Sequence, residues 1–125
     1  MTNNNSSEFP PVCFDYDMAL ENMGGDPSFL VELAQVFIKE SPERMALLKT
    51  AVQQKNSEQI YMIAHKLKGE SANFGRPRIE EMAHNISQMG RHNQLEQIEQ
   101  TFSQLEQEVL LFIADLKHRV LHANH

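Results

Sequence analysis

Apolar residues recur along this chain at intervals of three and four residues, which is the period of an amphipathic helix. A short first helix is predicted from Phe14, Tyr16 and Leu20, and the pair Gly24-Gly25 ends it. No stretch alternates apolar and polar residues as a half-buried strand would. The pattern therefore predicts an all-α protein.

Two further helices are predicted from the signals at their N-terminal ends. Asp26 can cap a helix in whose first turn Pro27 fits. Ser41-Pro42-Glu43 repeats this signal, so we expect a separate helix to begin there. The apolar positions after the two signals are Phe29, Leu30, Leu33, Val36 and Phe37, and then Met45, Leu48 and Val52.

The next predicted helix carries a histidine on its polar side. Asn56 and Gln59 resemble a capping box at its start. We expect this helix to run to about Asn73, because Gly75 suits a left-handed C-terminal cap. On a helical wheel, His65 lies at about 140° from the reference residue of the apolar face and points to solvent. That apolar face comprises Ile60, Ile63, Ala64, Leu67, Ser71 and Phe74.

The two C-terminal helices are predicted from longer apolar stripes. Pro77 lies near the start of the first, and Gly90 ends it. The last helix is the longest and is expected from about Asn93 to Leu121, with steps of three and four as in a helical bundle. The two stripes are Ile79, Met82, Ala83, Ile86 and Met89, and then Leu95, Ile98, Phe102, Leu105, Val109, Phe112, Leu116 and Val120.

Short loops join these five substantial helices, or six with the short one, and short loops favour antiparallel neighbours. We therefore expect an antiparallel four-helix bundle with additional short helices at its N-terminal end. The bundle is predicted over residues 14–121, between a flexible N-terminal tail at 1–13 and a C-terminal tail at 122–125. A chain of 125 residues can bury a real core in one such domain.

Composition narrows the classes of function. The formal net charge of −6 argues against nucleic acid as the main partner, because phosphate backbones call for a basic surface. Cys13 is the only cysteine, so a reduced, cytoplasmic setting is expected, and no stretch is long enough to span a membrane. His118, His122 and His125 have ligand-like spacing, but they lie at the chain end, where we do not expect a fixed second shell around a metal ion. We expect no metal site.

The residues around His65 suit the acceptance of a phosphoryl group. Residues three or four apart share a helix face, which places Lys68 and Gly69 beside the histidine and Ala72 one turn further. A neutral imidazole is a nucleophile, and Lys68 can supply positive charge to phosphoryl oxygens. The missing side chain at Gly69 leaves room for a partner. An ordinary surface histidine beside a tolerated glycine would show the same spacing.

A docking surface for a partner protein is predicted on the same side of this helix. Tyr61 and Met62 are two large apolar residues on the face opposite the core stripe. Lys66 lies nearby and would add a positive charge. We expect these three side chains to contact a partner that approaches His65.

The run His65-Lys66-Leu67-Lys68-Gly69, followed by Ser71-Ala72 and closed by Phe74-Gly75, closely resembles the signature of histidine phosphotransfer (HPt) domains. Gly24-Gly25-Asp26 resembles the family's entry into its second helix. The similarity in helix order and length runs from about Asp15 to Val120. It implies a four-helix bundle in which the phosphorylated histidine, here His65, is exposed in the middle of a helix. Lys68 and Gly69 match positions that help phosphoryl binding and partner access.

The chain departs from the family pattern at two positions. Ser87 stands where some members carry a glutamine that hydrogen-bonds the histidine, and its shorter side chain leaves open whether that helix orients His65, through Gln88 or a water. Glu70 stands where a small residue is common, but the helical wheel points it away from His65.

The resemblance implies a phosphocarrier in a two-component phosphorelay, not an enzyme. Such a protein takes a phosphoryl group from an aspartate on one receiver domain and passes it to a response-regulator receiver, which brings the Mg²⁺. A sensor or hybrid histidine kinase would be a further partner, and the carrier is expected to be a monomer. The five glycines form neither GxGxxG nor a P-loop, so no ATP site is expected. Two alternatives stay open: an adaptor that binds signalling proteins without accepting phosphate, and a purely structural bundle.

Overall fold

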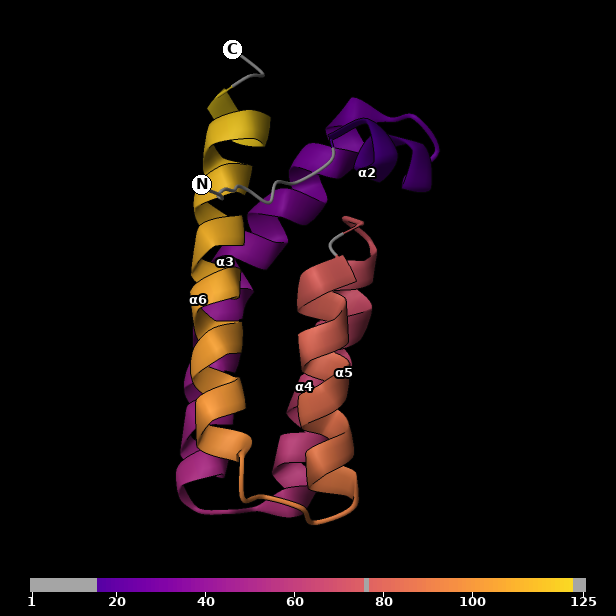
Figure 1. Ribbon diagram of the computed structural model, residues 1–125. Helices are drawn as coiled ribbons and strands as arrows, with labels where there is room; N and C mark the ends of the chain where they lie inside the picture. The colour runs from indigo at the N-terminus through magenta and orange to yellow at the C-terminus, as the bar shows by residue number, and fades with distance from the viewer. Residues whose placement is uncertain (1–15, 76, 123–125) are drawn as a thin grey trace, which may run out of the picture.

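The computed structural model describes residues 16–75 and 77–122, and every regular element in these ranges is helical (Figure 1). The elements are α2 at Tyr16–Asn22, α3 at Pro27–Gln53, α4 at Ser57–Ala72, α5 at Pro77–Arg91 and α6 at Ile98–Leu116, followed by the π-helical segment η1 at Lys117–His122. The predicted all-α bundle with a short N-terminal helix is thereby confirmed. Phe14, Cys13, the predicted tail 1–13 and residues 123–125 lie outside the described residues.

Four long helices form the body of the bundle. Figure 1 shows α3 and α6 running antiparallel along one side, while α4 and α5 form a second antiparallel pair. Contacts of α3 with α4, and of α5 with α6, join the two pairs. The largest side chains buried between them are Phe112, Leu30, Leu48, Ile60, Leu67, Ile79, Ile86, Ile98, Leu105, Leu116 and Val109.

Three phenylalanines connect α3, the end of α4 and α6. The ring centroid of Phe37 lies 5.6 Å from that of Phe74 and 5.1 Å from that of Phe112. Phe74 and Phe112 are 5.4 Å apart with their rings nearly perpendicular. Tilted and edge-on aromatic pairs of this kind contribute about 0.5–1.5 kcal/mol each beyond the burial of their area. This cluster fixes the C-terminal end of α4 against the other pair of helices.

The predicted break at Ser41-Pro42-Glu43 is wrong, because α3 runs unbroken through Pro42. Pro42 lies on the solvent side of α3. A proline inside a helix removes one backbone hydrogen bond, which costs about 3 kcal/mol. The buried stripe nevertheless stays in register across it, with Phe37 and Met45 both in the core. Each such side chain contributes about 1.5–3 kcal/mol on burial, so keeping the stripe in place outweighs the cost of the proline.

The last helix begins later than predicted. α6 starts at Ile98, not Asn93, because the backbone at Asn93 has a positive φ of 54° and leaves the helical path. Leu95 is only half-buried and belongs to the connection, not to the seam of α6. The remaining seam positions are all buried: Ile98, Phe102, Leu105, Val109, Phe112, Leu116 and Val120.

Gly90 does not end α5 as predicted; it lies inside the helix and is buried. A Cβ atom at this position would lie 2.8 Å from both the Ser57 oxygen and the Tyr61 nitrogen of the α4 backbone, and 3.0 Å from the Ile60 side chain. No real Cβ atom occupies such a position without movement of its surroundings. The absence of a side chain therefore allows α5 to pack directly on the first turns of α4.

Candidate functional site

His65 projects into solvent from the middle of α4. The helix begins as predicted, with the Asn56 side chain accepting a hydrogen bond from the Gln59 N–H at 3.2 Å. Gly75 follows the helix in the left-handed conformation, with a φ of 65°. The predicted buried face is present, since Ile60, Ala64, Leu67, Ser71 and Phe74 are buried and Ile63 is half-buried. The burial of this face is what turns His65 outward.

The imidazole of His65 is stacked on the ring of Tyr61, one turn earlier on α4. The two ring centroids are 5.5 Å apart and the planes differ by 19°. Tyr61 is half-buried, and the guanidinium carbon of Arg91 on α5 lies 6.0 Å from its ring centroid. Met62, beside it on the helix, is 53% exposed. The two residues predicted as apolar docking contacts thus have different surroundings.

Lys68 is half-buried between α4 and α5 and contacts a second histidine. Its Nζ lies 3.2 Å from Nδ1 of His84 on α5. A lysine ammonium only donates hydrogen bonds, so Nδ1 of His84 accepts this one with its lone pair. The sequence offered no signal for this pair, because His84 lies sixteen positions away and looked like an ordinary surface histidine. The contact holds the ammonium against α5, and Lys68 itself lies three residues after His65 on α4.

The surface next to His65 is open at Gly69. A Cβ atom added to Gly69 would meet nothing within 4 Å, and Ala72 one turn further is exposed. Ser87 on α5 is fully buried, and its hydroxyl donates to the His84 carbonyl of its own helix at 2.7 Å. In the part of the chain that the structure describes, His65 therefore receives no hydrogen bond from Ser87.

Glu70 faces α3 and not the histidine, as the helical wheel predicts. Its carboxylate lies 2.9 Å from the Arg44 guanidinium. Burial raises the pKa of Glu70 above its usual value of 4.5, although the charges of Arg44 and Lys66 lower it and that of Glu40 raises it further. Lys66 is exposed, and its charge acts on the flank of α4 that faces Glu70.

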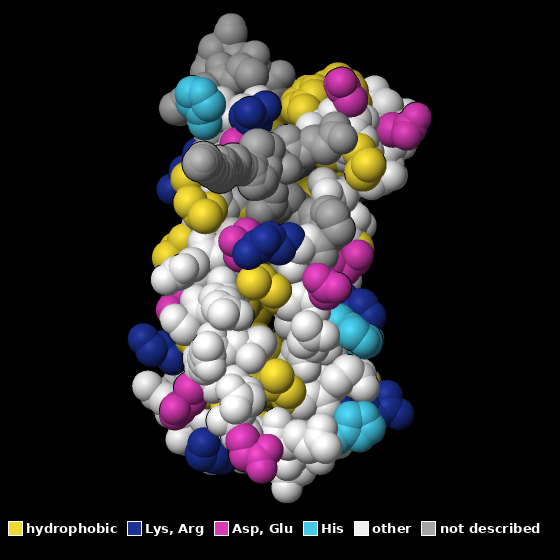
Figure 2. Space-filling view, viewed as in Figure 1, with side chains coloured by type: hydrophobic (Ala, Val, Ile, Leu, Met, Phe, Trp, Pro, Cys, Tyr) yellow, Lys and Arg dark blue, Asp and Glu magenta, His cyan; other side chains and the backbone are white. Residues whose placement is uncertain are grey.

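Basic and imidazole side chains gather on one edge of a protein that is acidic as a whole. Figure 2 shows histidines together with Lys or Arg side chains along the edge that α4 and α5 form. On these two helices, Lys66, Arg91 and His84 are exposed and Lys68 is half-buried. Cationic donors at close range are the groups that bind phosphoryl oxygens most strongly. The edge thus suits an anionic group carried by a partner.

Comparison with known protein families identifies the family to which this chain belongs. The family model of the Hpt domain matches residues 32–115, more than half of the chain and the whole of α4 and α5. The chain belongs to the Hpt domain family. Hpt domains carry phosphoryl groups on a histidine in phosphorelays, where they work with receiver domains and hybrid kinases and have no kinase activity of their own.

Two solved structures share the fold of this Hpt domain. One is histidine-containing phosphotransfer protein B from Pseudomonas aeruginosa, with a TM-score of 0.79 and 20% identity over 87% of this chain and 95% of that one. The other is the Hpt domain of a hybrid sensor histidine kinase from Shewanella, with a TM-score of 0.79 and 19% identity over 87% of this chain and 94% of that one. No curated protein matches the sequence.

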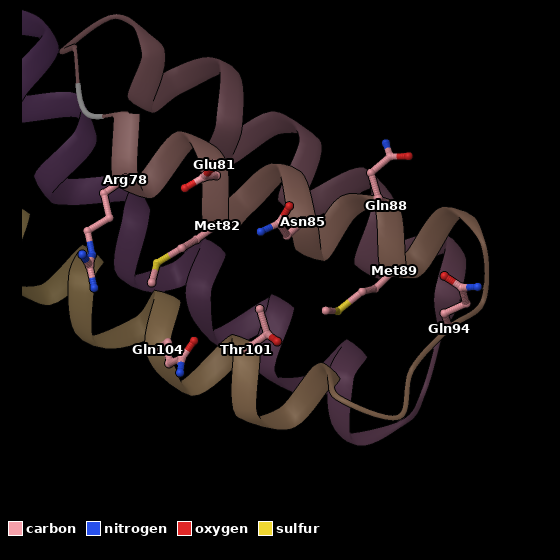
Figure 3. Close-up of a pocket in the computed structure, with 9 residues that line it drawn as sticks. All are labelled: Arg78, Glu81, Met82, Asn85, Gln88, Met89, Gln94, Thr101 and Gln104. Carbon is pink, nitrogen blue, oxygen red and sulfur yellow. The ribbon is translucent and has the colours of Figure 1, made fainter.

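Gln88, which could have replaced Ser87 beside the histidine, lies elsewhere on this Hpt domain. It is half-buried and lines an open groove of about 530 Å³ between α5 and α6 (Figure 3). Met82 and Met89 of α5 line the same groove opposite Thr101 and Gln104 of α6. Among the described residues, no hydrogen bond joins Gln88 to His65.

Two further features concern metals and membranes. Within residues 16–75 and 77–122, no three His, Cys, Asp or Glu side chains gather closely enough to hold a metal ion. His118 is exposed on η1, and His125 lies outside the described residues. None of the described helices is long and apolar enough to cross a membrane.

Proposed function

We propose that this Hpt domain carries its phosphoryl group on His65, which receives it from an aspartate of one receiver domain and passes it to another. The observation that carries the proposal is the exposure of His65 in mid-helix, with open space at Gly69 and the Lys68 ammonium on the same side. A residue three positions along a helix lies about 5–6 Å away between Cβ atoms, within reach of a phosphoryl group on the imidazole.

The bonds that form and break in the transfer step belong only to the imidazole and the donor. The lone pair of a neutral ring nitrogen attacks the phosphorus, so that a P–N bond forms and the P–O bond to the receiver aspartate breaks. The electron pair of the broken bond leaves with the aspartate carboxylate, and the proton on the other ring nitrogen remains on the imidazole. Catalysis of such a step depends on positioning and on neutralisation of the equatorial oxygens, which is the role of Lys68.

The partner side of the proposal is a receiver domain that docks over Tyr61, Met62 and Lys66, with the clearing at Gly69 and Ala72 admitting its active site. That receiver brings the Mg²⁺, and a hybrid sensor kinase supplies the phosphoryl group upstream. The carrier works as a cytoplasmic monomer without a nucleic-acid partner, in keeping with its acidic charge and single cysteine. It is a phosphocarrier and not an enzyme, since the sequence contains neither GxGxxG nor a P-loop.

A radiolabel transfer assay tests the proposal. A receiver domain labelled on its aspartate is mixed with Mg²⁺ and either the wild type, His65→Gln, or the matched control His92→Gln, which removes another exposed histidine. We expect an acid-labile, alkali-stable label on the wild type and the control, and none on His65→Gln. Label that persists on His65→Gln would contradict the assignment, and a folded wild type that accepts nothing from several receivers would favour an adaptor.

A further inference from the structure

Within residues 16–75 and 77–122, no hydrogen bond from another residue explains the orientation of the His65 ring. Ser87 donates to a carbonyl of its own helix, and Gln88 lines the groove between α5 and α6. An exposed imidazole without a partner exchanges between rotamers, whereas in-line attack on phosphorus requires a ring held close to one geometry. A contact other than a hydrogen bond can also restrict the ring.

The ring of Tyr61 supplies that contact. It lies nearly parallel to the imidazole, at 19° and 5.5 Å between centroids, within the range of an offset aromatic stack. Tyr61 itself is held from α5, where Gly90 packs against its backbone nitrogen and the Arg91 guanidinium approaches its ring at 6.0 Å. A half-buried tyrosine in contact with α5 thus lies next to an exposed histidine.

We infer that Tyr61 is the positioning residue of the phosphoryl acceptor, and this inference rests on the proposed function of His65. The stack covers one face of the imidazole, while the ring nitrogens lie at its edge, where the new P–N bond forms in the plane of the ring. Tyr61 therefore restricts the ring without blocking the attack. Through Gly90 and Arg91, α5 orients the histidine indirectly, by holding the tyrosine.

The size of the effect follows from the strength of such stacks. The interaction between two such rings raises the population of the stacked arrangement about two- to tenfold relative to rotamers that lack the stack. Loss of the flat ring should slow phosphorylation of His65 by about the same factor. Tyr61→Phe keeps the ring and should react as the wild type does, whereas Tyr61→Leu keeps the apolar bulk but loses the stack.

Two phosphoryl donors separate positioning from docking. A phosphorylated receiver must bind the surface that includes Tyr61 and Met62, whereas phosphoramidate is a small donor without a protein surface that would need to dock there. In its reaction the P–N bond to the amide nitrogen breaks and ammonia leaves. Rates are compared for the wild type, Tyr61→Phe, Tyr61→Leu and Met62→Ser, each checked for helical content. The ring-proton resonances of His65, identified by their loss in His65→Gln, report the stack directly through its ring current.

We expect Tyr61→Leu to react more slowly with both donors and to move the His65 ring resonances, while Tyr61→Phe changes neither. Met62→Ser should slow only the reaction with the receiver. A Tyr61→Leu variant that reacts with phosphoramidate at the wild-type rate would overturn the inference and leave Tyr61 as a docking contact. Unmoved His65 resonances in Tyr61→Leu would overturn it as well. A folded wild type that takes no label from several receivers would refute the proposed function instead, and the resonances would still show whether the stack exists.

Discussion

Two helical glycines with opposite surroundings allow a stringent test of this structure. Gly69 of α4 and Gly90 of α5 both lie inside helices, so replacement by alanine gives the same change of side chain in both cases. A methyl group at Gly69 meets nothing within 4 Å, whereas one at Gly90 would lie 2.8 Å from two backbone atoms of α4. The two substitutions should change stability in opposite directions.

The expected magnitudes follow from helix propensity and packing. Glycine in a helix interior costs about 1 kcal/mol relative to alanine, so Gly69→Ala should raise the free energy of unfolding by about that amount. At Gly90 this gain is smaller because the residue lies in the last turn of α5. The contact atoms belong to the α4 backbone, so the two helices must separate, and overpacking of this kind costs about 1–3 kcal/mol. We expect Gly90→Ala to lower stability by about 1–2 kcal/mol net.

Urea unfolding followed by far-ultraviolet circular dichroism measures both changes, since the transition of a single helical domain is cooperative. The comparison is sound when the three proteins show the same dependence of the unfolding free energy on urea. If Gly90→Ala were as stable as Gly69→Ala, or more stable than the wild type, the close approach of α5 to α4 would be refuted. Gly69→Ala should also slow phosphotransfer despite its greater stability, because its methyl group occupies the clearing beside His65.

Two predictions concern the surroundings of the site. Because burial raises the pKa of Glu70, the folded state binds a proton at this residue more readily than the unfolded state does. The free energy of unfolding of the wild type, compared with that of Glu70→Gln, should therefore increase as the pH falls from neutral through the raised pKa toward 4.5. Urea unfolding of both proteins across that pH range measures this increase. His84→Ala should slow phosphotransfer because Lys68 loses its acceptor, and His84→Asn, whose amide oxygen replaces Nδ1, should restore the rate.

Each of these two predictions has its own control. A constant stability difference between the wild type and Glu70→Gln at all pH values would show that Glu70 titrates alike in the folded and unfolded states. For His84, the Lys68→Ala background is decisive. If His84→Ala slows transfer equally with and without the lysine, the two residues act independently and the contact between them has no functional role.

Much of the fold could be predicted from the sequence because helical periodicity and capping are local. Asn56, Asp26 and Gly75 cap or end helices through atoms within a few residues of them, so their roles follow from short stretches of sequence. The outward position of His65 follows in the same way from the apolar residues on the other side of its helix. Local rules failed at Pro42, where a start signal lies inside a continuous helix.

Only the tertiary structure decided which side chains meet across helices. The partner of Lys68 is His84, that of Glu70 is Arg44, and the methyl group excluded at Gly90 would have met the backbone of α4. These contacts depend on how whole helices are placed relative to one another. The burial of many core side chains together sets that placement, so no single stretch of sequence specifies it. The sequence by itself thus determined that His65 faces solvent, while the packing of α5 on α4 determined what surrounds it.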